Sequence, residues 1–333
     1  MRSARTLREM FIFLLNSLYM KVVFIDSVHP VLEERLTSSG KFQCVDATCL
    51  DLESCLEELK DAVGIVIRSR FTMNEDFLKG ADKLQLIARS GAGMENIDEV
   101  YCASRNITLF NAPEGNRNAV GEQALGMLLS IYNRLHIANN QVRNGIWDRE
   151  GNRGLELDGK TVGIIGFGNN GQAFAKKLRG FDVDVLVYDK YKQDYGTEYV
   201  TEATLDAVLR KSDVISFHIP QNDETIHFAN EEFFDALGKQ VVLLNLSRGK
   251  IVKTRALLDA IKAGTVLGAG LDVNEFEKKS FEAFFDEDRP AELEELLGCE
   301  KVLLTPHIGG WSHESYFKLS DVLADKILEH YLD

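Results

Sequence analysis

The chain has 333 residues, which is enough for two domains of ordinary size, each with its own core. Its formal net charge of −14 argues against a nucleic-acid partner and against an anionic membrane surface, because both require a basic face on the protein. With 45% hydrophobic and 27% charged residues, the composition predicts a soluble globular protein with a small-molecule task.

The N-terminus is set apart from the rest of the chain. Three arginines precede the apolar run 10–15, which superficially resembles a secretion signal. The run is too short to span a bilayer, no small-residue cleavage site follows, and a strand begins at Lys21. We therefore predict that residues 1–19 are an extension without function, either from a misassigned start codon or as a loosely attached arm.

Short β-branched runs then alternate with amphipathic segments. The expected strands are 21–25, 63–67, 84–88 and 107–110, and the expected helices between them include 51–60 and 74–79. Strands that alternate with helices predict βαβ units and a parallel sheet. A long helical stretch follows, roughly 117–143, and ends near Asn144-Gly145.

The alternation restarts after this helix. The expected strands are 161–165, 183–188, 213–217, 241–245, 266–271 and 301–304, and the last helix covers about 312–330. Two successive patterns of this kind predict an α/β protein with two doubly wound, Rossmann-like parallel sheets. A ligand would lie in an interdomain cleft, at the carboxyl ends of the strands. The predicted domains are 20–116 plus 306–333, and 117–305.

A glycine-rich turn follows the strand 161–165, and it reads Gly166-Phe167-Gly168-Asn169-Asn170-Gly171. The first glycine permits a tight turn, the second lets the backbone approach a pyrophosphate, and the third lets the helix pack closely. Asp189 ends the next strand, where a carboxylate accepts ribose hydroxyls and repels a 2′-phosphate. The pattern predicts NAD rather than NADP, although Lys190 and Lys192 could soften the repulsion.

Arg248, Asp272 and His307 each come directly after an expected strand of the second domain, so they are expected at one edge of its sheet. Taken singly, each has a structural interpretation, as a helix cap, a strand end and a core histidine. Together with Glu277, they are the groups needed to hold an organic acid and move its proton. A nicotinamide cofactor would move the hydride.

From about residue 21 to 330, the chain resembles the D-isomer-specific 2-hydroxyacid dehydrogenase family. The resemblance rests on the glycine turn with its acidic partner and on five further segments: Ser90-Gly91-Ala92-Gly93-Met94-Glu95-Asn96-Ile97-Asp98, Asn111-Ala112-Pro113 with Asn116, Asn245-Leu246-Ser247-Arg248-Gly249, Leu271-Asp272-Val273 with the following glutamate, and Thr305-Pro306-His307-Ile308-Gly309-Gly310.

The resemblance implies a role for each catalytic residue. His307 would be the general base that removes the hydroxyl proton, and Glu277 would orient its ring and favour the imidazolium. Arg248 would bind the substrate carboxylate and polarise the 2-oxo group. Glu275 is an alternative partner for the histidine; Glu277 is chosen because its offset from Asp272 fits the family spacing.

The resemblance also implies the binding residues. Substrate would be held by the backbone N–H groups of the glycine-rich loop and by neighbouring side chains, namely Gly91, Ala92, Gly93, Arg68, Ser69 and Asn111. Asp272 would contact the nicotinamide side of NAD, while His218, Ile219 and Pro220 would line its pocket. Thr225 and Ser247 complete the predicted cofactor set. The acidic segment 278–299 is irregular for the family and is interpreted as a surface loop rather than a cover of the cleft.

The substrate is left open between two acids. Arg68-Ser69-Arg70 ends an expected strand, and arginines there suit a phosphate, as in the family's 3-phosphoglycerate enzymes of serine biosynthesis. Arg70 is equally well read as surface charge. In this interpretation the protein is a short form without a regulatory C-terminal domain. Glyoxylate or hydroxypyruvate is the alternative substrate, and an NAD-sensing corepressor is the alternative of another class.

The remaining expectations concern partners and surroundings. The resemblance implies a homodimer, in which Trp147 lies at the interface or instead covers its own core. No metal is expected, because the arginine does the polarising. The five cysteines form no CxxC pair, which predicts buried reduced thiols and a cytoplasmic protein.

Overall fold

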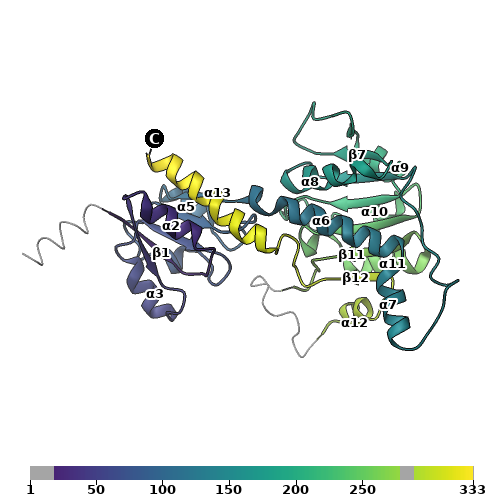
Figure 1. Cartoon of the computed structure of the whole chain (residues 1–333), viewed down its shortest axis with the longest axis horizontal. Coiled ribbons are helices and arrows are strands. Elements are labelled where there is room, and N and C mark those ends of the chain that lie inside the picture. Colours follow the sequence, from purple (N-terminus) through teal and green to yellow (C-terminus); the bar gives the residue numbers. More distant parts are fainter. Residues whose placement is uncertain (1–18, 278–288, 333) are drawn as a thin grey trace, which may run out of the picture. The chain divides into compact units, whose positions relative to one another are not determined.

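The computed structural model describes residues 19–277 and 289–332. The chain divides into two compact units, one running to Asn116 and resuming at Ser312, the other comprising Arg117–Trp311 (Figure 1). The chain therefore returns to the first unit at Ser312, whereas the sequence analysis placed this return at residue 306. All but the last residue of the predicted extension 1–19, and the first half of the acidic segment 278–299, lie outside the described residues.

The first unit is built on one parallel sheet. Its strands, in the order β2-β1-β3-β4-β5, are β1 (Met20–Phe24), β2 (Phe42–Asp46), β3 (Gly64–Ile67), β4 (Leu86–Arg89) and β5 (Thr108–Asn111). Its helices are α2 (Val31–Ser38), α3 (Leu52–Leu59), α4 (Glu75–Leu78), α5 (Glu99–Ser104) and α13 (His313–Leu332).

Both faces of this sheet are buried, which explains the continuous apolar runs of its strands. In β1, Val22 faces a cluster with Leu36 of α2 and Leu323 of α13, whereas Val23 faces a cluster with Leu59 of α3. The last helix α13 therefore packs beside α2 on one face, although the two are far apart in the sequence (Figure 1).

The second unit has a larger parallel sheet, in the order β12-β11-β10-β9-β6-β7-β8. Its strands are β6 (Thr161–Ile165), β7 (Asp184–Tyr188), β8 (Thr201–Glu202), β9 (Val214–Phe217), β10 (Val241–Asn245), β11 (Val266–Leu271) and β12 (Val302–Leu304). Its helices include α6 (Pro113–Tyr132), which enters from the first unit, α7 (Leu135–Arg143), α8 (Asn169–Lys177), α9 (Leu205–Lys211), α10 (Glu231–Asp235), α11 (Thr254–Ala263) and α12 (Ala291–Leu297), with short 3₁₀ turns at Leu178–Gly180 and Gly249–Ile251.

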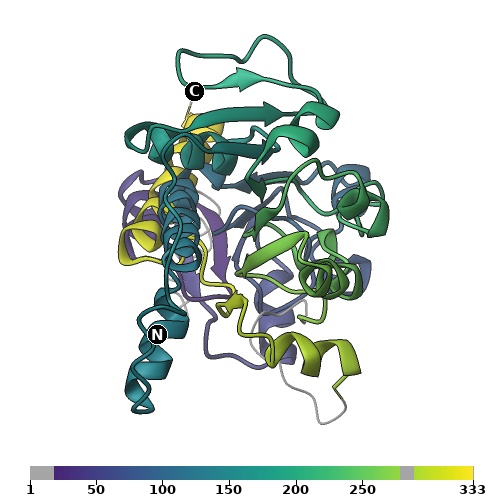
Figure 2. The ribbon, with the colours of Figure 1, turned by 90° about the vertical axis from the view of Figure 1, so that its right-hand side faces the viewer.

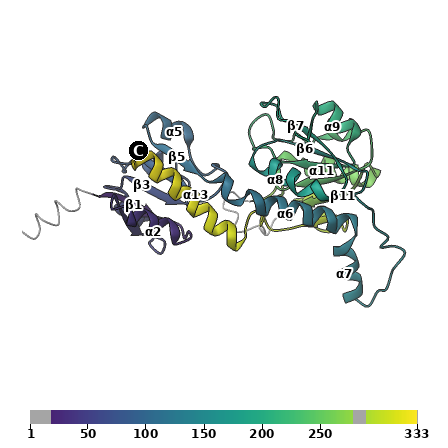
Figure 3. The same cartoon turned by 45° about the horizontal axis from the view of Figure 1, so that its top comes forward.

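Helices cover both faces of this sheet (Figures 2 and 3). The central strand β10 alternates between them: Leu243 joins a cluster with α9, α10, α11 and α12, and Leu244 joins a cluster with α6 and α8. This arrangement places the carboxyl ends of all the strands at one edge of the sheet, where the predicted site residues follow β6, β7, β9, β10, β11 and β12.

The predicted two-sheet α/β fold is confirmed, with local differences. The edge strands β2 and β8 and the helix α2 were not among the elements predicted from the sequence. The predicted helix 117–143 begins earlier, at Pro113, and is interrupted before Leu135. The interruption falls at Arg134, whose φ of 53° is a left-handed conformation that an α-helix does not contain.

Two expectations about exposed side chains are corrected. Trp147 is 85% exposed, so the interpretation that it covers its own core is wrong. Cys55 and Cys102 are buried as expected, but Cys49 is exposed, and burial raises the pKa of the Cys102 thiol to about 11. In the part of the chain that the structure describes, no helix is both long and apolar enough to cross a membrane.

Candidate active site

The glycine turn between β6 and α8 has the backbone that its sequence predicts. Gly166 has a φ of 96°, and a Cβ there would lie 2.5 Å from the carbonyl oxygen of His218. A Cβ at Gly171 would lie 2.1 Å from the carbonyl oxygen of Gly166. At Gly168, in contrast, a Cβ would meet nothing within 4 Å. The first and third glycines thus allow close backbone packing, and the second leaves space for a ligand.

The helix α8 begins at this turn without a side-chain cap. Its first N–H groups and the positive end of its dipole therefore suit a phosphate. Two buried side-chain atoms beside the turn, Asn170 Oδ1 and His218 Nδ1, have no hydrogen-bond partner among the described residues. Open space, an uncapped helix and unsatisfied polar atoms fit the pyrophosphate and ribose of a dinucleotide.

Asp189 fixes the turn from the end of β7. Its Oδ2 accepts a hydrogen bond from the Phe167 N–H at 2.7 Å, and its Oδ1 accepts from the N–H groups of Tyr191 at 2.9 Å and Lys192 at 3.1 Å. Lys192 Nζ in turn donates to the carbonyl oxygen of Phe167 at 2.6 Å. These contacts hold the Asp189 carboxylate beside the glycine turn, where the sequence predicts the ribose.

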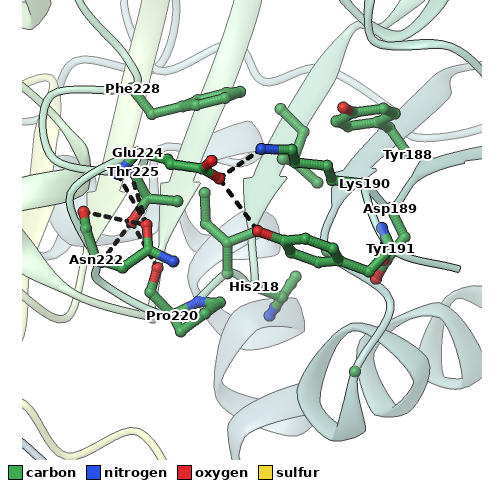
Figure 4. Close-up of a pocket in the computed structure, with 14 residues that line it drawn as sticks. Tyr188, Asp189, Lys190, Tyr191, His218, Pro220, Asn222, Glu224, Thr225 and Phe228 are labelled. Carbon is green, nitrogen blue, oxygen red and sulfur yellow. Dashed lines mark hydrogen bonds and ion pairs between the residues drawn. The ribbon is translucent and has the colours of Figure 1, made fainter.

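A pocket of about 220 Å³ opens beside the turn (Figure 4). It is lined by predicted cofactor residues, Gly166, Gly168, Asp189, His218, Ile219, Pro220 and Thr225, by the cation Lys190 that the sequence indicated nearby, and by residues not predicted, Ile165, Tyr188, Tyr191, Asn222, Glu224 and Phe228. Asn169, Asn170, Gly171, Ser247 and Asp272 do not line it. The loop after β9 supplies half of the unpredicted residues, and only its starting motif His218-Ile219-Pro220 carries a sequence signal.

His218 is held neutral in the wall of this pocket. Its Nε2 hydrogen-bonds to Ser216 Oγ at 2.8 Å, and its ring lies against Phe174, with 5.6 Å between ring centroids. Burial lowers the pKa of His218 to about 4, because desolvation disfavours the charged imidazolium. The residue therefore contributes shape and hydrogen bonding to the pocket at neutral pH, without a positive charge.

His307 and Glu277 form the predicted pair. His307 Nδ1 lies 3.2 Å from Glu277 Oε1 and 3.3 Å from Oε2, and both side chains are mostly buried. Glu275, the alternative, pairs instead with His227, at 2.6 Å between Oε1 and Nε2. Because the carboxylate is on the Nδ1 side of the His307 ring, proton exchange with a substrate falls to Nε2.

Asp272 organises the backbone around His307. Its main-chain oxygen accepts from the His307 N–H at 2.8 Å, and its carboxylate accepts from the N–H groups of Ile308 at 2.9 Å and Gly309 at 2.6 Å. His307 has a φ of 52°, a conformation that costs energy in a residue other than glycine. The three hydrogen bonds to Asp272 hold His307 in this strained conformation.

The Asp272 carboxylate is 1% exposed, and two side chains complete its contacts. Thr305 Oγ1 donates to Asp272 Oδ1 at 2.5 Å, and Gln123 Nε2 of α6 donates to the same oxygen at 2.8 Å and to Thr305 Oγ1 at 3.1 Å. All these partners are protein groups, so the predicted contact between Asp272 and nicotinamide stays a prediction. Gln123 was not identified from the sequence.

Arg248 follows β10 in a turn shaped by the fully buried Asn245. Asn245 Oδ1 accepts from the N–H and Oγ of Ser247, and its Nδ2 donates to the Arg248 carbonyl at 2.9 Å. The half-buried Arg248 donates from Nη1 to the Ser247 carbonyl at 2.6 Å. Since β10, β11 and β12 are neighbours, the turns that carry Arg248, Asp272 and His307 are adjacent.

In the first unit, the predicted substrate loop follows β4. The Gly91 carbonyl accepts from the Ala112 N–H at 2.9 Å, and Asn111 Nδ2 donates to the Ala92 carbonyl at 2.7 Å. The Asn111 side chain thus connects the loop after β4 to the end of β5. Its predicted role in substrate binding stays a prediction.

The segment Arg68-Ser69-Arg70 wraps around a carboxylate of the protein itself. Asp26 Oδ2 accepts from the three consecutive N–H groups, at 2.5, 3.0 and 3.2 Å. Arg70 donates from Nη1 to the carbonyls of Ile25, Ala47 and Thr48, and from Nη2 to that of Leu50. Arg70 therefore stabilises the ends of β1 and β2, so the interpretation that it is only surface charge is wrong.

Within residues 19–277 and 289–332, no three histidine, cysteine or carboxylate side chains are grouped as metal ligands. The polar groups that converge on the edge of the second sheet are instead a dinucleotide-type turn, an arginine and a carboxylate–imidazole pair. With two doubly wound sheets, they define a dinucleotide-binding α/β protein with acid–base groups beside the nucleotide site.

Comparison with known proteins identifies the family. The NAD-binding domain of D-isomer specific 2-hydroxyacid dehydrogenases matches residues 125–309, and the chain belongs to this family. NAD is the cofactor of that domain, as the glycine turn and Asp189 predict. The resemblance drawn from the sequence motifs is thereby confirmed.

The relatives carry different names. D-3-phosphoglycerate dehydrogenase of Methanocaldococcus jannaschii is 30% identical over 92% of this chain and 56% of that protein, and glyoxylate reductase of Pyrococcus furiosus is 33% identical over 83% and 81%. The crystal structure of Aquifex aeolicus D-lactate dehydrogenase, complexed with NAD and lactic acid, has a TM-score of 0.78, with 27% identity over 94% of this chain and 95% of that chain. The chain spans about half the length of the phosphoglycerate dehydrogenases that it matches.

Proposed function

We propose that this protein is an NAD-dependent oxidoreductase that interconverts a D-2-hydroxy acid and its 2-oxo acid. The observation that carries the proposal is the His307–Glu277 pair, which lies in the same unit as the glycine turn. His307 follows β12, whose neighbour β11 precedes Asp272, and β10, the next strand in the sheet, precedes Arg248. An imidazole oriented by a carboxylate suits proton transfer in both directions.

In the oxidation, His307 Nε2 accepts the proton of the substrate hydroxyl while the C2–H bond breaks. NAD, which the glycine turn and Asp189 would hold, would supply the hydride acceptor for the oxidation and the hydride donor for the reverse reaction. The imidazolium is stabilised by Glu277, and the Arg248 guanidinium neutralises the substrate carboxylate and polarises the carbonyl that forms. In the reduction, the same imidazolium donates its proton to the carbonyl oxygen.

For the substrate, 3-phosphohydroxypyruvate and its reduced form 3-phosphoglycerate are the first candidates. Arg68 at the end of β3 supports a phosphate, and the relative from Methanocaldococcus jannaschii carries the corresponding name. Glyoxylate and hydroxypyruvate are the second candidates. The engagement of Arg70 by backbone carbonyls and the relative from Pyrococcus furiosus favour these smaller acids.

The test is NADH oxidation with 3-phosphohydroxypyruvate, hydroxypyruvate and glyoxylate, measured for the wild type and for Arg68→Met and Arg70→Met. For a phosphate enzyme, Arg68→Met raises KM for the phosphorylated acid about 10- to 100-fold and leaves the other acids nearly unchanged, because one charge-assisted contact is lost. Arg70→Met lowers thermal stability and affects all three acids alike. Faster turnover of unphosphorylated acids that is indifferent to Arg68 establishes the second candidates.

We also propose a homodimer. The exposed apolar residues Leu135, Val142, Ile146 and Trp147 follow one another along α7 and the segment after it, which favours burial against a second copy. Light scattering of the wild type and of Trp147→Ser tests this proposal. A dimer that dissociates more readily in the variant supports it, and a wild type that is monomeric at micromolar concentration contradicts it.

A further inference from the structure

The pocket beside the glycine turn is crossed by a cluster of charged and polar side chains that the sequence patterns did not reveal. Lys190 and Tyr191, after β7, both point toward Glu224 in the loop after β9 (Figure 4). Lys190 Nζ lies 2.5 Å from Glu224 Oε2, and the Tyr191 hydroxyl donates to the same oxygen at 3.1 Å. All three residues line the pocket.

The loop that carries Glu224 is internally braced. Asn222 Oδ1 accepts from the Glu224 N–H at 3.0 Å and from the Thr225 N–H at 3.1 Å, and Thr225 Oγ1 donates to the Pro220 carbonyl at 2.7 Å. The Glu224 carboxylate is therefore presented by a defined turn. The side chain itself is placed by its contacts with Lys190 and Tyr191.

Both members of the ion pair are charged at neutral pH. The hydrogen bond from Lys190 lowers the pKa of Glu224, and the same hydrogen bond raises the pKa of Lys190. Among the described residues that line the pocket, Asp189 and Glu224 are the carboxylates and Lys190 is the cation. Lys192 donates to a backbone carbonyl and does not line the pocket. The lining thus carries a net negative charge.

We propose that Glu224 is a second acidic determinant of cofactor choice, which engages Lys190 and adds its carboxylate to that of Asp189, so that the pocket selects NAD against NADP. A 2′-phosphate would face two carboxylates, and the cation that could have stabilised it is already paired. The inference rests on the assignment of this pocket to the adenosine half of the cofactor, which belongs to the proposed function.

The expected effect is moderate. The side chains of Lys190 and Glu224 are 53% and 58% exposed, and exposed ion pairs change affinities by factors of a few rather than by orders of magnitude. Removing the Glu224 charge both lowers the repulsion of a phosphate and releases Lys190 to bind it. We therefore expect the ratio of the NAD to the NADP affinity to fall about fivefold in Glu224→Gln.

The experiment is a double-mutant cycle read by calorimetric binding of NAD⁺ and NADP⁺, which needs no substrate and no turnover. Its variants are Glu224→Gln, Lys190→Met and the two together. Glutamine is similar in size to glutamate and still offers Tyr191 an acceptor. Glu231→Gln is the matched control: it removes a glutamate that pairs with Lys253 at 2.7 Å, away from the pocket.

Support is a gain in NADP⁺ affinity in Glu224→Gln that is larger than any change for NAD⁺, that is lost when Lys190→Met is added, and that is not seen in Glu231→Gln. An equal effect in Glu231→Gln, or a gain that survives Lys190→Met, overturns the inference that Glu224 acts through Lys190. A wild type that binds neither nucleotide overturns the assignment of the pocket itself. A wild type that binds NAD⁺ but turns over no 2-oxo acid contradicts the proposed reaction only. The binding affinities of the four proteins in the double-mutant cycle still support or overturn the role of Glu224.

Discussion

Glu275 and His227 form a carboxylate–imidazole pair of their own, with 2.6 Å between Glu275 Oε1 and His227 Nε2. The other oxygen of Glu275 accepts from the N–H of Thr254, the first residue of α11, at 2.8 Å. Both carboxylate oxygens of Glu275 therefore accept hydrogen bonds from other groups. The carboxylate beside His307 is that of Glu277. This contact decides between the two glutamates that the sequence left in competition.

The first prediction contrasts these two glutamates. Glu277→Gln removes the negative charge that stabilises the imidazolium of His307, so we expect kcat to fall about 100-fold and its dependence on pH to change. The affinity for NADH, measured by fluorescence, stays within about twofold, because Glu277 does not line the pocket beside the glycine turn.

Glu275→Gln is the matched control two residues away. It weakens the link to α11, so the free energy of unfolding falls by about 1–2 kcal/mol, while kcat and its pH profile stay close to the wild type. A Glu275→Gln variant with the larger kinetic loss would show that the pairing of the two glutamates differs in the working enzyme.

The second prediction concerns Gln123, which acts on His307 through Asp272. Gln123→Met removes both hydrogen bonds to the buried Asp272 and Thr305 but keeps a side chain of similar length. We expect unfolding to become easier by about 1–3 kcal/mol, because the donors of a buried carboxylate are not replaced by water. We also expect kcat to fall more than the NADH affinity, since the hydrogen bonds around His307 weaken.

Asn118→Ala provides the control on the same helix, because Asn118 makes only an exposed contact with Glu122 among the described residues. It leaves both stability and kcat nearly unchanged. Chemical unfolding and steady-state kinetics on the two variants distinguish the cases. If Gln123→Met matches Asn118→Ala in both measurements, Gln123 has no positioning role.

The strands were predictable from the sequence wherever both faces of the sheet are buried. Runs such as 63–67 and 241–245 are continuously apolar because α/β packing covers both sides. The edge strand β2 gave no such signal: Gln43 is exposed, and polar residues interrupt the run. The break at Arg134 was also hidden, because no glycine or proline marks its left-handed backbone.

In the site, local motifs predicted the glycine turn and Asp189, and the family resemblance implied the His307–Glu277 pair. What they did not predict are contacts between residues far apart in the chain. Gln123 and Asp272 are 149 positions apart, and Glu224 meets Lys190 across 34 positions. Neither Gln123 nor Glu224 belongs to a motif, because each acquires its role only when the sheet brings separate segments to one edge.

The third prediction is a dependence of stability on pH that comes from His218. Its pKa is lowered to about 4 by burial, whereas an exposed histidine in the unfolded chain has a pKa near 6.5. Between these values the unfolded state binds a proton that the folded state does not. Stability is therefore fully present above about pH 6.5 and decreases as the pH falls toward 4.

His218→Asn removes this titration and keeps a polar group near Ser216. As the pH falls from 6.5 to 4, the wild type should lose up to about 3 kcal/mol more unfolding free energy than the variant does. Comparing the two proteins cancels the titration of all other groups. Parallel stability curves over this range would contradict the neutral, buried state of His218.

The last prediction tests how closely the Arg248 turn packs against the segment that carries Glu277. A Cβ on Gly249 would lie 1.7 Å from the carbonyl oxygen and 2.1 Å from the carbonyl carbon of Asn274. Both are backbone atoms, so no side-chain rotation relieves the clash. Glu277 donates its N–H to the same Asn274 carbonyl at 3.3 Å, so a displaced Asn274 also moves the partner of His307.

Gly249→Ala should therefore reduce both stability and activity. We expect the free energy of unfolding to fall by about 2–3 kcal/mol, as for other overpacked sites, and kcat/KM to fall at least about tenfold, because Arg248 and Glu277 are pushed apart. Gly126→Ala in α6 is the control: it is exposed, with nothing within 4 Å of the added Cβ, and should stabilise the helix by about 0.5–1 kcal/mol without kinetic effect. Urea unfolding and kinetics at saturating NADH measure both. Wild-type stability and activity in Gly249→Ala would mean that the two segments do not touch, and Arg248 would then be positioned by the Asn245 turn alone.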